Sequence, residues 1–280
     1  MIQEAFWYNA RMPSPDSILS YLFPWRQTWL LRQFVQRQVE ARYRGSVLGI
    51  GWSLLNPLLQ LAVYTFIFRH VFRMHWVGST GSVDFGLRLF AGMVVFGLFA
   101  ECVMRAPNLI FEQPHLVKKV RFPTEILSWA SLISALFPAA LGLLLLLFVC
   151  MLMGIFPNPA WIALPLIWLP LLPLLLGLGW LLSAMGVYLR DLGQVLGIVV
   201  TMLQFLSPIF YPISALPAKV QTIAYLNPLA LIIEQSRAAI FAGEWPAIRP
   251  WLIEMTACML LATGGAMVFR RLRKGFADVV

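Results

Sequence analysis

The sequence predicts an all-α integral membrane protein with six transmembrane helices. Of its 280 residues, 60% are hydrophobic and only 12% are charged, whereas a typical soluble domain has about 25% charged residues. The mean hydropathy is +0.78. Long uncharged runs recur along the chain, and the longest, residues 126–189, contains no Asp, Glu, Lys, Arg or His. These properties exclude an ordinary soluble enzyme, and the high apolar content also excludes a disordered chain.

Six segments are long and apolar enough to cross a bilayer, which requires about 20 mostly apolar residues. The run of residues 126–189 has the length of two spans, and the turn-forming sequence Pro157-Asn158-Pro159 divides it. Two further apolar segments each contain a single carboxylate within the apolar stretch, Glu101 in one and Glu254 in the other. The predicted spans are residues 47–69, 87–106, 126–153, 161–188, 193–211 and 250–269.

The distribution of cations predicts which side of the membrane holds the termini. With six spans and both termini in the cytoplasm, 15 of the 21 Lys and Arg residues fall in cytoplasmic segments and 6 in outer ones. Cytoplasmic flanks of membrane proteins are enriched in Lys and Arg, and residues 270–274 supply four cations directly after the last span. The net charge of +9 suits the anionic inner leaflet, so we expect contact with membrane lipids and none with nucleic acid.

Residues 1–46 form the predicted cytoplasmic N-terminal segment, and residues 26–44 within it are expected to be helical. Most of the cations lie opposite one broad apolar face, although Arg42 falls on the apolar side. This pattern favours a helix at the inner-leaflet interface, and a solvated basic flank is the alternative. The apolar face consists of Leu30, Leu31, Phe34, Val35 and Val39.

Two connections between spans are more than plain loops. Residues 114–121 begin with a proline, are basic and end shortly before Pro123, which indicates a short cytoplasmic helix. They either dock a partner or form a basic loop. Residues 212–249 contain four prolines yet are apolar, so they are too broken to span and too apolar to lie in water. Re-entrant helices on the outer side satisfy both facts, and a hairpin lying on the surface is the alternative.

Patterns for catalysis or metal binding are missing from the sequence. It contains no Gly-Lys dipeptide, so it lacks the phosphate-binding loop of an ATPase and is not expected to hydrolyse ATP itself. It also lacks Asp-x-Asp, His-Glu-x-x-His and Gly-x-Ser-x-Gly. The three cysteines and three histidines are scattered. We therefore predict no catalytic residue, no metal site and no cofactor bound by this chain.

For several side chains within the predicted spans, the pattern favours a structural role. Glu101 precedes Arg105 by four residues, which predicts an ion pair on one helix face. Glu254 is expected to reach the lipid headgroups near the outer surface. Gly193 and Gly197 form a face of small residues that permits close helix approach. Tryptophans near the predicted span ends, Trp180 among them, fit an aromatic belt.

Four stretches of the sequence carry a family resemblance. They are Ala41-Arg42-Tyr43-Arg44-Gly45-Ser46-Val47-Leu48-Gly49 with Trp52-Ser53-Leu54-Leu55-Asn56-Pro57, then Leu116-Val117-Lys118-Lys119-Val120-Arg121-Phe122-Pro123, then Tyr188-Leu189-Arg190-Asp191-Leu192, and finally Ser207-Pro208-Ile209-Phe210-Tyr211-Pro212 with Leu226-Asn227-Pro228-Leu229. In this order, over residues 41–229, the sequence resembles the permeases of polysaccharide ABC exporters. These permeases form part of the ABC-2 family and include exporters of O-antigen, capsule and teichoic acid.

The resemblance implies that residues 1–280 form one ABC-2 type transmembrane domain, which pairs with a second copy as a homodimer. It also implies two copies of a separate cytoplasmic ATPase subunit, which bind ATP and Mg²⁺. A coupling helix at residues 112–121 is expected to contact this subunit, and an interface helix is expected at residues 26–44. The expected coupling residues are Glu112, His115, Lys118, Lys119 and Arg121, and those at the cytoplasmic entrance of the channel are Arg44, Leu48 and Gly49.

The sequence is therefore interpreted as a transport subunit in the bacterial inner membrane that exports lipid-linked polysaccharide and is not an enzyme. Tyr64, Phe205, Phe210 and Tyr211 are expected to line the translocation path, because aromatic rings stack on sugar faces; simple helix packing is the alternative. Three other functions remain open. They are an ABC-2 exporter of a small hydrophobic compound, an integral membrane enzyme that modifies glycans or lipids, and a secondary carrier.

Overall fold

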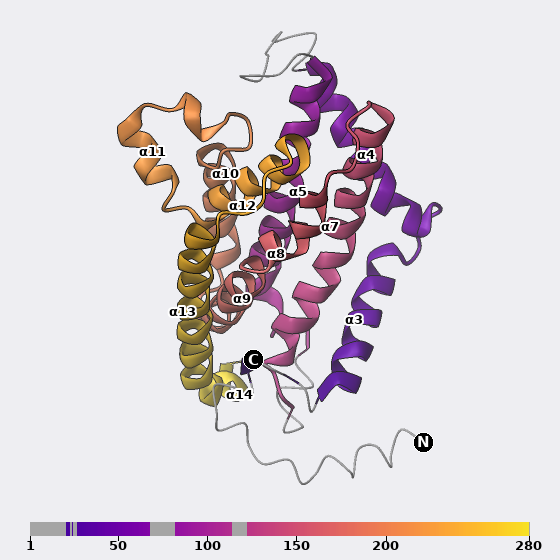
Figure 1. Ribbon diagram of the computed structural model, residues 1–280. Helices are drawn as coiled ribbons and strands as arrows, with labels where there is room; N and C mark the ends of the chain where they lie inside the picture. Colours follow the sequence, from indigo (N-terminus) through magenta and orange to yellow (C-terminus); the bar gives the residue numbers. More distant parts are fainter. Residues whose placement is uncertain (1–20, 23, 25–26, 68–81, 114–121, 280) are drawn as a thin grey trace.

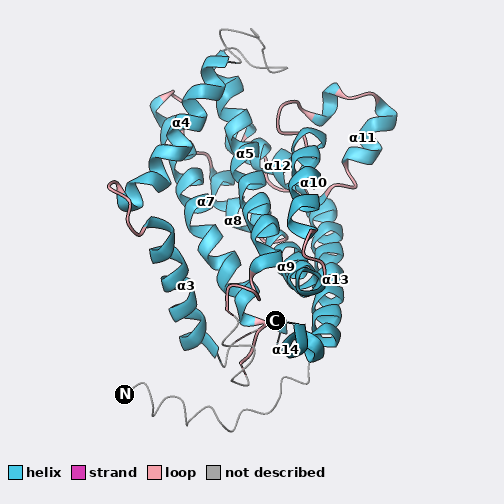
Figure 2. Cartoon of the chain, turned by 180° about the vertical axis from the view of Figure 1, so that it is seen from behind, coloured by secondary structure: helices cyan, strands magenta, loops and turns pink. Residues whose placement is uncertain are grey.

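The computed structural model describes residues 21–22, 24, 27–67, 82–113 and 122–279, and the structural statements below concern these residues. They form helices and turns, with no strand among them (Figure 2). The predicted all-α class is therefore confirmed for the described part of the chain. The longer helices are α3 (Thr28–Tyr43), α4 (Trp52–Phe66), α5 (Ser82–Arg105), α7 (Ile126–Leu152), α9 (Leu171–Tyr188), α10 (Leu192–Leu206) and α13 (Ile248–Leu272), and the shorter ones include α8 (Leu164–Trp168), α11 (Ala218–Ala224), α12 (Pro228–Arg237) and α14 (Phe276–Val279).

Four helical stretches are long and apolar enough to cross a membrane: Phe85–Asn108, Ile126–Leu152, Pro159–Tyr188 and Ile248–Gly275. They match the predicted spans 87–106, 126–153, 161–188 and 250–269 closely. Few charges interrupt these stretches, although a turn at residues 169–170 separates α8 from α9 within Pro159–Tyr188. The agreement follows from the apolar runs themselves, which leave the backbone no alternative to internal hydrogen bonds in a bilayer.

The other two predicted spans correspond to shorter helices. Within the described residues, α4 and α10 each have 15 residues. α4 begins at Trp52 rather than residue 47, because a 3-10 turn at Gly49–Gly51 precedes it. α10 ends at Leu206 rather than residue 211, because Ser207 has extended backbone geometry before Pro208, as residues preceding proline commonly do.

From α4 onward, the long helices run side by side in alternating directions (Figure 1). The end of the bundle that holds α14 is called the α14 end, and the end that holds α11 and α12 is called the α11 end. α3 lies along the half of α7 nearest the α14 end, and α4 continues beside α5 and α7 toward the α11 end. α12 lies against α5 and α8, whereas α11 projects from the bundle with no buried residue.

α9 and α13 approach each other most closely at small residues. A Cβ added at Gly177 would lie 2.7 Å from the Cα of Ala262, and one at Gly265 would overlap the backbone of Gly177. At Gly193 and Gly197, which permit a close helix approach, no other helix backbone approaches among the described residues. Open space surrounds Gly193, and a Cβ at Gly197 would meet only the end of one flexible side chain.

Tryptophan indoles hold segments together inside the bundle. Trp180 is completely buried and donates to the carbonyl oxygen of Glu125 at 3.1 Å, so its assignment to an aromatic belt is wrong. Trp129 donates to the carbonyl oxygen of Tyr21 at 2.8 Å, and Trp251 donates to that of Leu166 at 2.8 Å. The buried indole N–H of Trp180 requires an acceptor, and for all three tryptophans the acceptor is a backbone carbonyl of another segment.

Candidate functional site

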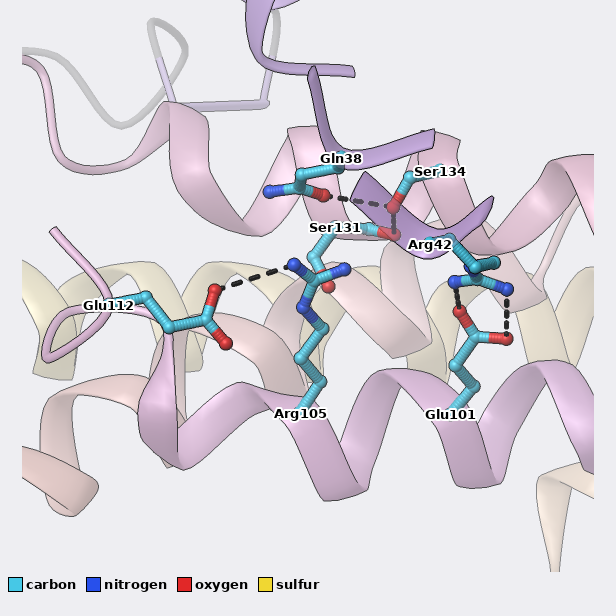
Figure 3. A network of polar contacts seen from close by, with 7 residues as sticks. All are labelled: Gln38, Arg42, Glu101, Arg105, Glu112, Ser131 and Ser134. Carbon is cyan, nitrogen blue, oxygen red and sulfur yellow. Dashed lines mark hydrogen bonds and ion pairs between the residues drawn. The ribbon is translucent and has the colours of Figure 1, made fainter. Parts of the chain in front are cut away.

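The C-terminal end of α3 is tied to α5 by an ion pair (Figure 3). Both Nη atoms of Arg42 donate to the carboxylate of Glu101, and the Nη1–Oε2 distance is 3.2 Å. Partial burial lowers the pKa of Arg42, but the hydrogen bond and negative charge of Glu101 raise it by more. The guanidinium therefore stays charged and the pair stays intact at neutral pH.

This contact corrects the predicted pairing of Glu101 with Arg105. Glu101 bonds to another helix, and Arg105 instead contacts Glu112 at 3.4 Å, on the turn that follows α5 (Figure 3). The i,i+4 spacing permits a pair on one helix, but a two-pronged contact with a guanidinium from a neighbouring helix makes better hydrogen bonds. The pairing also explains why Arg42 lies on the apolar side of α3.

A second polar contact joins α3 to α7 one turn before Arg42. The Oγ of Ser134 lies 2.9 Å from the Oε1 of Gln38 and 2.9 Å from the carbonyl oxygen of Ser131, so its single proton is shared between two acceptors. Farther toward the start of α3, the rings of Phe34 and Phe122 lie 5.4 Å apart. The side of α3 that faces the bundle is thus a stripe at four-residue spacing, formed by Leu30, Phe34, Gln38 and Arg42.

Only one of the expected coupling residues lies in the described part of the chain. Glu112 follows the 3-10 turn Ala106–Asn108 and is held by Arg105, while its backbone N–H donates to the carbonyl oxygen of Asn108 at 2.9 Å. His115, Lys118, Lys119 and Arg121 lie outside the described residues. Their coupling role remains a prediction.

The chain that follows residues 114–121 is anchored to the end of α13. Arg273 contacts the carboxylate of Glu125 at 2.9 Å and donates to the carbonyl oxygen of Phe122 at 2.7 Å. The Glu125 side chain is 2% exposed. Burial raises the pKa of Glu125, and the charge of Arg273 opposes this by lowering it. The sequence analysis missed this joint, because both residues lie at the ends of spans that are far apart in sequence.

The expected entrance residues lie together on the turn between α3 and α4. Arg44 is exposed and Leu48 is 52% exposed. Gly45 and Gly49 have φ values of +80° and +51°, a region that favours glycine. The turn therefore depends on these two glycines, and the position of the three residues at a channel entrance stays a prediction.

The expected path residues gather near the break after α10. Phe205 and Phe210 stack with ring centroids 5.5 Å apart, and the Tyr211 hydroxyl contacts the carbonyl oxygens of Phe205 at 2.9 Å and Leu206 at 3.1 Å. Phe205 is 61% exposed, whereas Phe210 is half-buried. Tyr64 and Phe210 pack against the same two buried residues of α5, which are Phe85 and Leu89.

A buried arginine that the sequence analysis counted only as an outer cation organises this break. The Arg237 side chain is 3% exposed and contacts Glu234 at 3.2 Å. It donates to the carbonyl oxygens of Arg88 at 2.8 Å, Ile209 at 2.6 Å and Pro208. Burial lowers the pKa of Arg237 to about 10, despite the opposing charge of Glu234, so it remains protonated at neutral pH. The sequence signal that could have identified Arg237 is a cation within an otherwise apolar stretch.

Asn227 joins the same break to the start of α12. Its side-chain amide donates to the Ser207 hydroxyl at 2.9 Å, while its Oδ1 accepts from the backbone N–H of Leu229 at 3.0 Å. The second bond is the usual cap of a helix N-terminus. Asn227 and Arg237 thus attach both ends of α12 to the segment that ends α10.

Glu254 does not reach the surface as the sequence analysis expected. It is 7% exposed on α13, and its two carboxylate oxygens have no hydrogen-bond partner among the described residues. The described part of the chain brings no three His, Cys, Asp or Glu side chains together in a group that could hold a metal ion.

Comparison with known proteins assigns the chain to a family. The pattern of the family described as ABC-2 type transporter matches residues 30–241, which extend from α3 to the segment after α12. This chain belongs to the ABC-2 type transporter family. It is a transport permease subunit and not an enzyme, and its four long apolar helices make it a multi-pass membrane protein.

Relatives of this ABC-2 permease match it over most of their length. It is 29% identical over 254 residues to "O-antigen export system permease protein RfbA" of Myxococcus xanthus, covering 90% of this chain and 95% of that protein. It is 27% identical over 209 residues to "Polysialic acid transport protein KpsM" of Escherichia coli, covering 74% and 79%. It is 24% identical over 248 residues to "Capsule polysaccharide export inner-membrane protein CtrC" of Neisseria meningitidis serogroup A, covering 87% and 91%.

Proposed function

We propose that this chain is the permease subunit of an ATP-driven exporter that moves lipid-linked polysaccharide, O-antigen or capsular, across the bacterial inner membrane. The observation that carries the proposal is its similarity, over 95% of the relative's length, to an O-antigen export permease. Relatives named for polysialic acid transport and capsule polysaccharide export point to the same class of substrate. A hydrated polymer is the cargo that these names share.

The proposed topology has six spans, with α4 and α10 crossing beside the four longer stretches. The α14 end then faces the cytoplasm together with both termini, and residues 212–249 face outward with α12 as a re-entrant helix. The clustered cations of residues 270–274 lie at the α14 end, which supports this orientation. A cysteine at Leu226, which is 80% exposed, should react with an impermeant thiol reagent added outside, and one at Lys274 should not. The reverse pattern would contradict the topology.

In the proposed assembly, two copies of this chain form a homodimer with two copies of a cytoplasmic ATPase subunit that binds ATP and Mg²⁺. The ATPase pushes on the coupling segment, residues 112–121, and on α3 at the inner-leaflet interface. Two ion pairs support this route. Arg42–Glu101 connects α3 to α5, and Glu125–Arg273 connects the chain after the coupling segment to the end of α13. The polymer then passes between the two protomers.

Charge reversal in the coupling segment tests the function. Lys118→Glu with Lys119→Glu should abolish export and the stimulation of ATP hydrolysis, while the chain still inserts and forms dimers. Lys219→Glu, at an exposed position on α11, is the matched control and should export normally. Release of polysaccharide from vesicles that contain the purified complex is the measurement. Transport of a small hydrophobic dye without polysaccharide release would favour the alternative cargo.

A further inference from the structure

A polar stripe runs along one face of α4, a helix that the proposed topology places in the membrane. Ser53, Asn56 and Gln60 recur at the three- and four-residue spacing that puts side chains on one helix face. Ser53 is buried, whereas Asn56 and Gln60 are exposed. Among the described residues, no hydrogen-bond partner meets the side-chain amide of either Asn56 or Gln60.

The stripe faces a cavity of about 440 Å³ between α3, α4, α5 and α7. This volume lies within the range of about 300–1,000 Å³ that is typical of ligand pockets. The remaining walls are largely apolar, with Phe90 and Val94 from α5 and Pro138 from α7. The polar lining includes Arg42, Tyr43, Trp52, Asn56, Gln60 and Glu101.

Two exposed amides facing hydrocarbon would lack any hydrogen-bonding partner, which is costly in a bilayer. Polar side chains within membrane segments therefore usually face a water-filled cavity or a polar ligand. The opposite face of α4 shows the contrast, because Leu54 and Leu58 are exposed there and need no polar neighbour. The position of Asn56 and Gln60 thus predicts polar contents for the cavity.

The charges of the cavity restrict what those contents are. Arg42 and Glu101 neutralise each other through their paired hydrogen bonds, so the site holds no isolated cation for a phosphate and no isolated anion for an amine. What remains are amides that both donate and accept, the free N–H groups of a guanidinium and two aromatic rings. This set matches a neutral, hydroxylated ligand, since hydroxyl groups donate and accept and the C–H faces of sugar rings pack on aromatic rings.

We propose that this cavity binds sugar residues of the lipid-linked polysaccharide within each protomer, beside the path between protomers. The inference rests on the proposed function and adds a binding site to it. Sugar hydroxyl groups bond to Asn56, Gln60 and the Arg42–Glu101 pair, and Trp52 packs against a ring face. The apolar walls exclude water from the other side.

Thiol labelling tests occupancy directly. The purified complex with Asn56→Cys is placed in vesicles of phosphatidylethanolamine and phosphatidylglycerol and treated with a hydrophilic maleimide. The native cysteines Cys102, Cys150 and Cys258 are buried and give a low background. We expect rapid labelling at position 56, slowed about tenfold by lipid-linked polysaccharide extracted from the same cells when its concentration is about ten times its Kd, since protection follows the occupancy of the site. Leu58→Cys, on the lipid-facing side, is the matched control and should show no such protection.

Two labelling results would overturn the proposal. If position 56 does not react at all, the cavity is dry or is covered by a second copy of the chain. If phosphatidylglycerol content, rather than polysaccharide, slows the reaction, the cavity binds a bilayer lipid. Both results are independent of whether transport occurs.

Export by substituted complexes supplies the second measurement. Asn56→Leu with Gln60→Leu removes both amides and keeps apolar bulk, so export should fall about tenfold, while Leu58→Ala should export normally. Normal export by the double variant contradicts the proposal. A wild-type complex that releases no polysaccharide contradicts the proposed function instead, and the labelling assay still decides whether the cavity binds sugar.

Discussion

Arg42 in α3 and Glu101 in α5 lie 59 residues apart in the sequence and form one two-pronged ion pair. The pair fixes the end of α3 beside the turn that leads into α4. It also supplies the charged part of the cavity lined by Asn56 and Gln60. One contact therefore joins the helix proposed to receive the ATPase stroke to the site proposed to hold sugar.

Removing the guanidinium should loosen α3. Arg42→Gln leaves Glu101 without its partner and should destabilise the protein by about 1–2 kcal/mol, since hydrogen bonds to charged groups are worth more than neutral ones. Thermal unfolding in detergent measures this effect. Arg37→Gln, at an exposed position of the same helix, is the control and should change little. Equal stability of both variants would show that the pair does not hold α3.

Arg237 should be far more sensitive than an exposed arginine nearby. Arg237→Gln leaves Glu234 and three backbone carbonyl groups without a buried donor. Breaking a buried ion pair from one side costs about 3–5 kcal/mol. Arg249→Gln, at an exposed position, should stay within about 0.5 kcal/mol of the wild type. A melting temperature that is unchanged by Arg237→Gln would disprove its role in holding the break after α10.

Phe205 and Phe210 should respond differently to truncation. Phe205 is 61% exposed, so Phe205→Ala should leave stability nearly unchanged but alter the export rate if the ring lines the path. Phe210 packs against α5, and Phe210→Ala should destabilise the protein by about 2 kcal/mol, roughly half the value for a fully buried ring. Complex yield, thermal stability and vesicle export separate the two effects. Normal export by Phe205→Ala would remove it from the path.

The joint between Glu125 and Arg273 predicts a pH dependence. Burial raises the folded-state pKa of Glu125 above its ordinary value of 4.5, and Arg273 only partly offsets this. The folded protein then binds the proton more tightly than the unfolded chain, so this group stabilises the fold below pH 4.5 and the stabilisation is lost as pH rises through the folded-state pKa.

The wild type should accordingly lose thermal stability relative to Glu125→Gln as the pH rises above 4.5. Glutamine has no titratable side chain. The difference between the melting temperatures of the wild type and Glu125→Gln therefore reports the carboxyl group of Glu125 alone. Arg273→Gln removes the charge that lowers the pKa of Glu125, so the loss should extend to higher pH. Parallel melting curves for the wild type and Glu125→Gln across this range would contradict the assignment.

The apolar runs were sufficient to predict the four long helices, because uncharged sequences of that length have few stable alternatives to a span. Hydropathy could not reveal the contacts that join them. Arg42 stood out only as a misplaced cation on α3, and Arg237 stood out only as a cation in an apolar segment; their partners depend on which helices are neighbours. The spacing of Glu101 and Arg105 suggested an ion pair within α5, but Glu101 pairs with Arg42 of α3 instead. The coupling residues beyond Glu112 rest on the resemblance alone.

The contact between α9 and α13 bears on how such a transporter transmits force. At Gly177, Ala262 and Gly265 the two backbones meet with no room for a further methyl group, and the Tyr188 hydroxyl donates to the carbonyl oxygen of Leu272 at 3.0 Å near their common end. Sliding either helix by one residue would drive side chains into the opposing backbone. We therefore expect the two helices to move as one rigid unit within the subunit. In the proposed mechanism, this rigid unit would transmit a displacement at the α14 end along the length of the subunit with little bending.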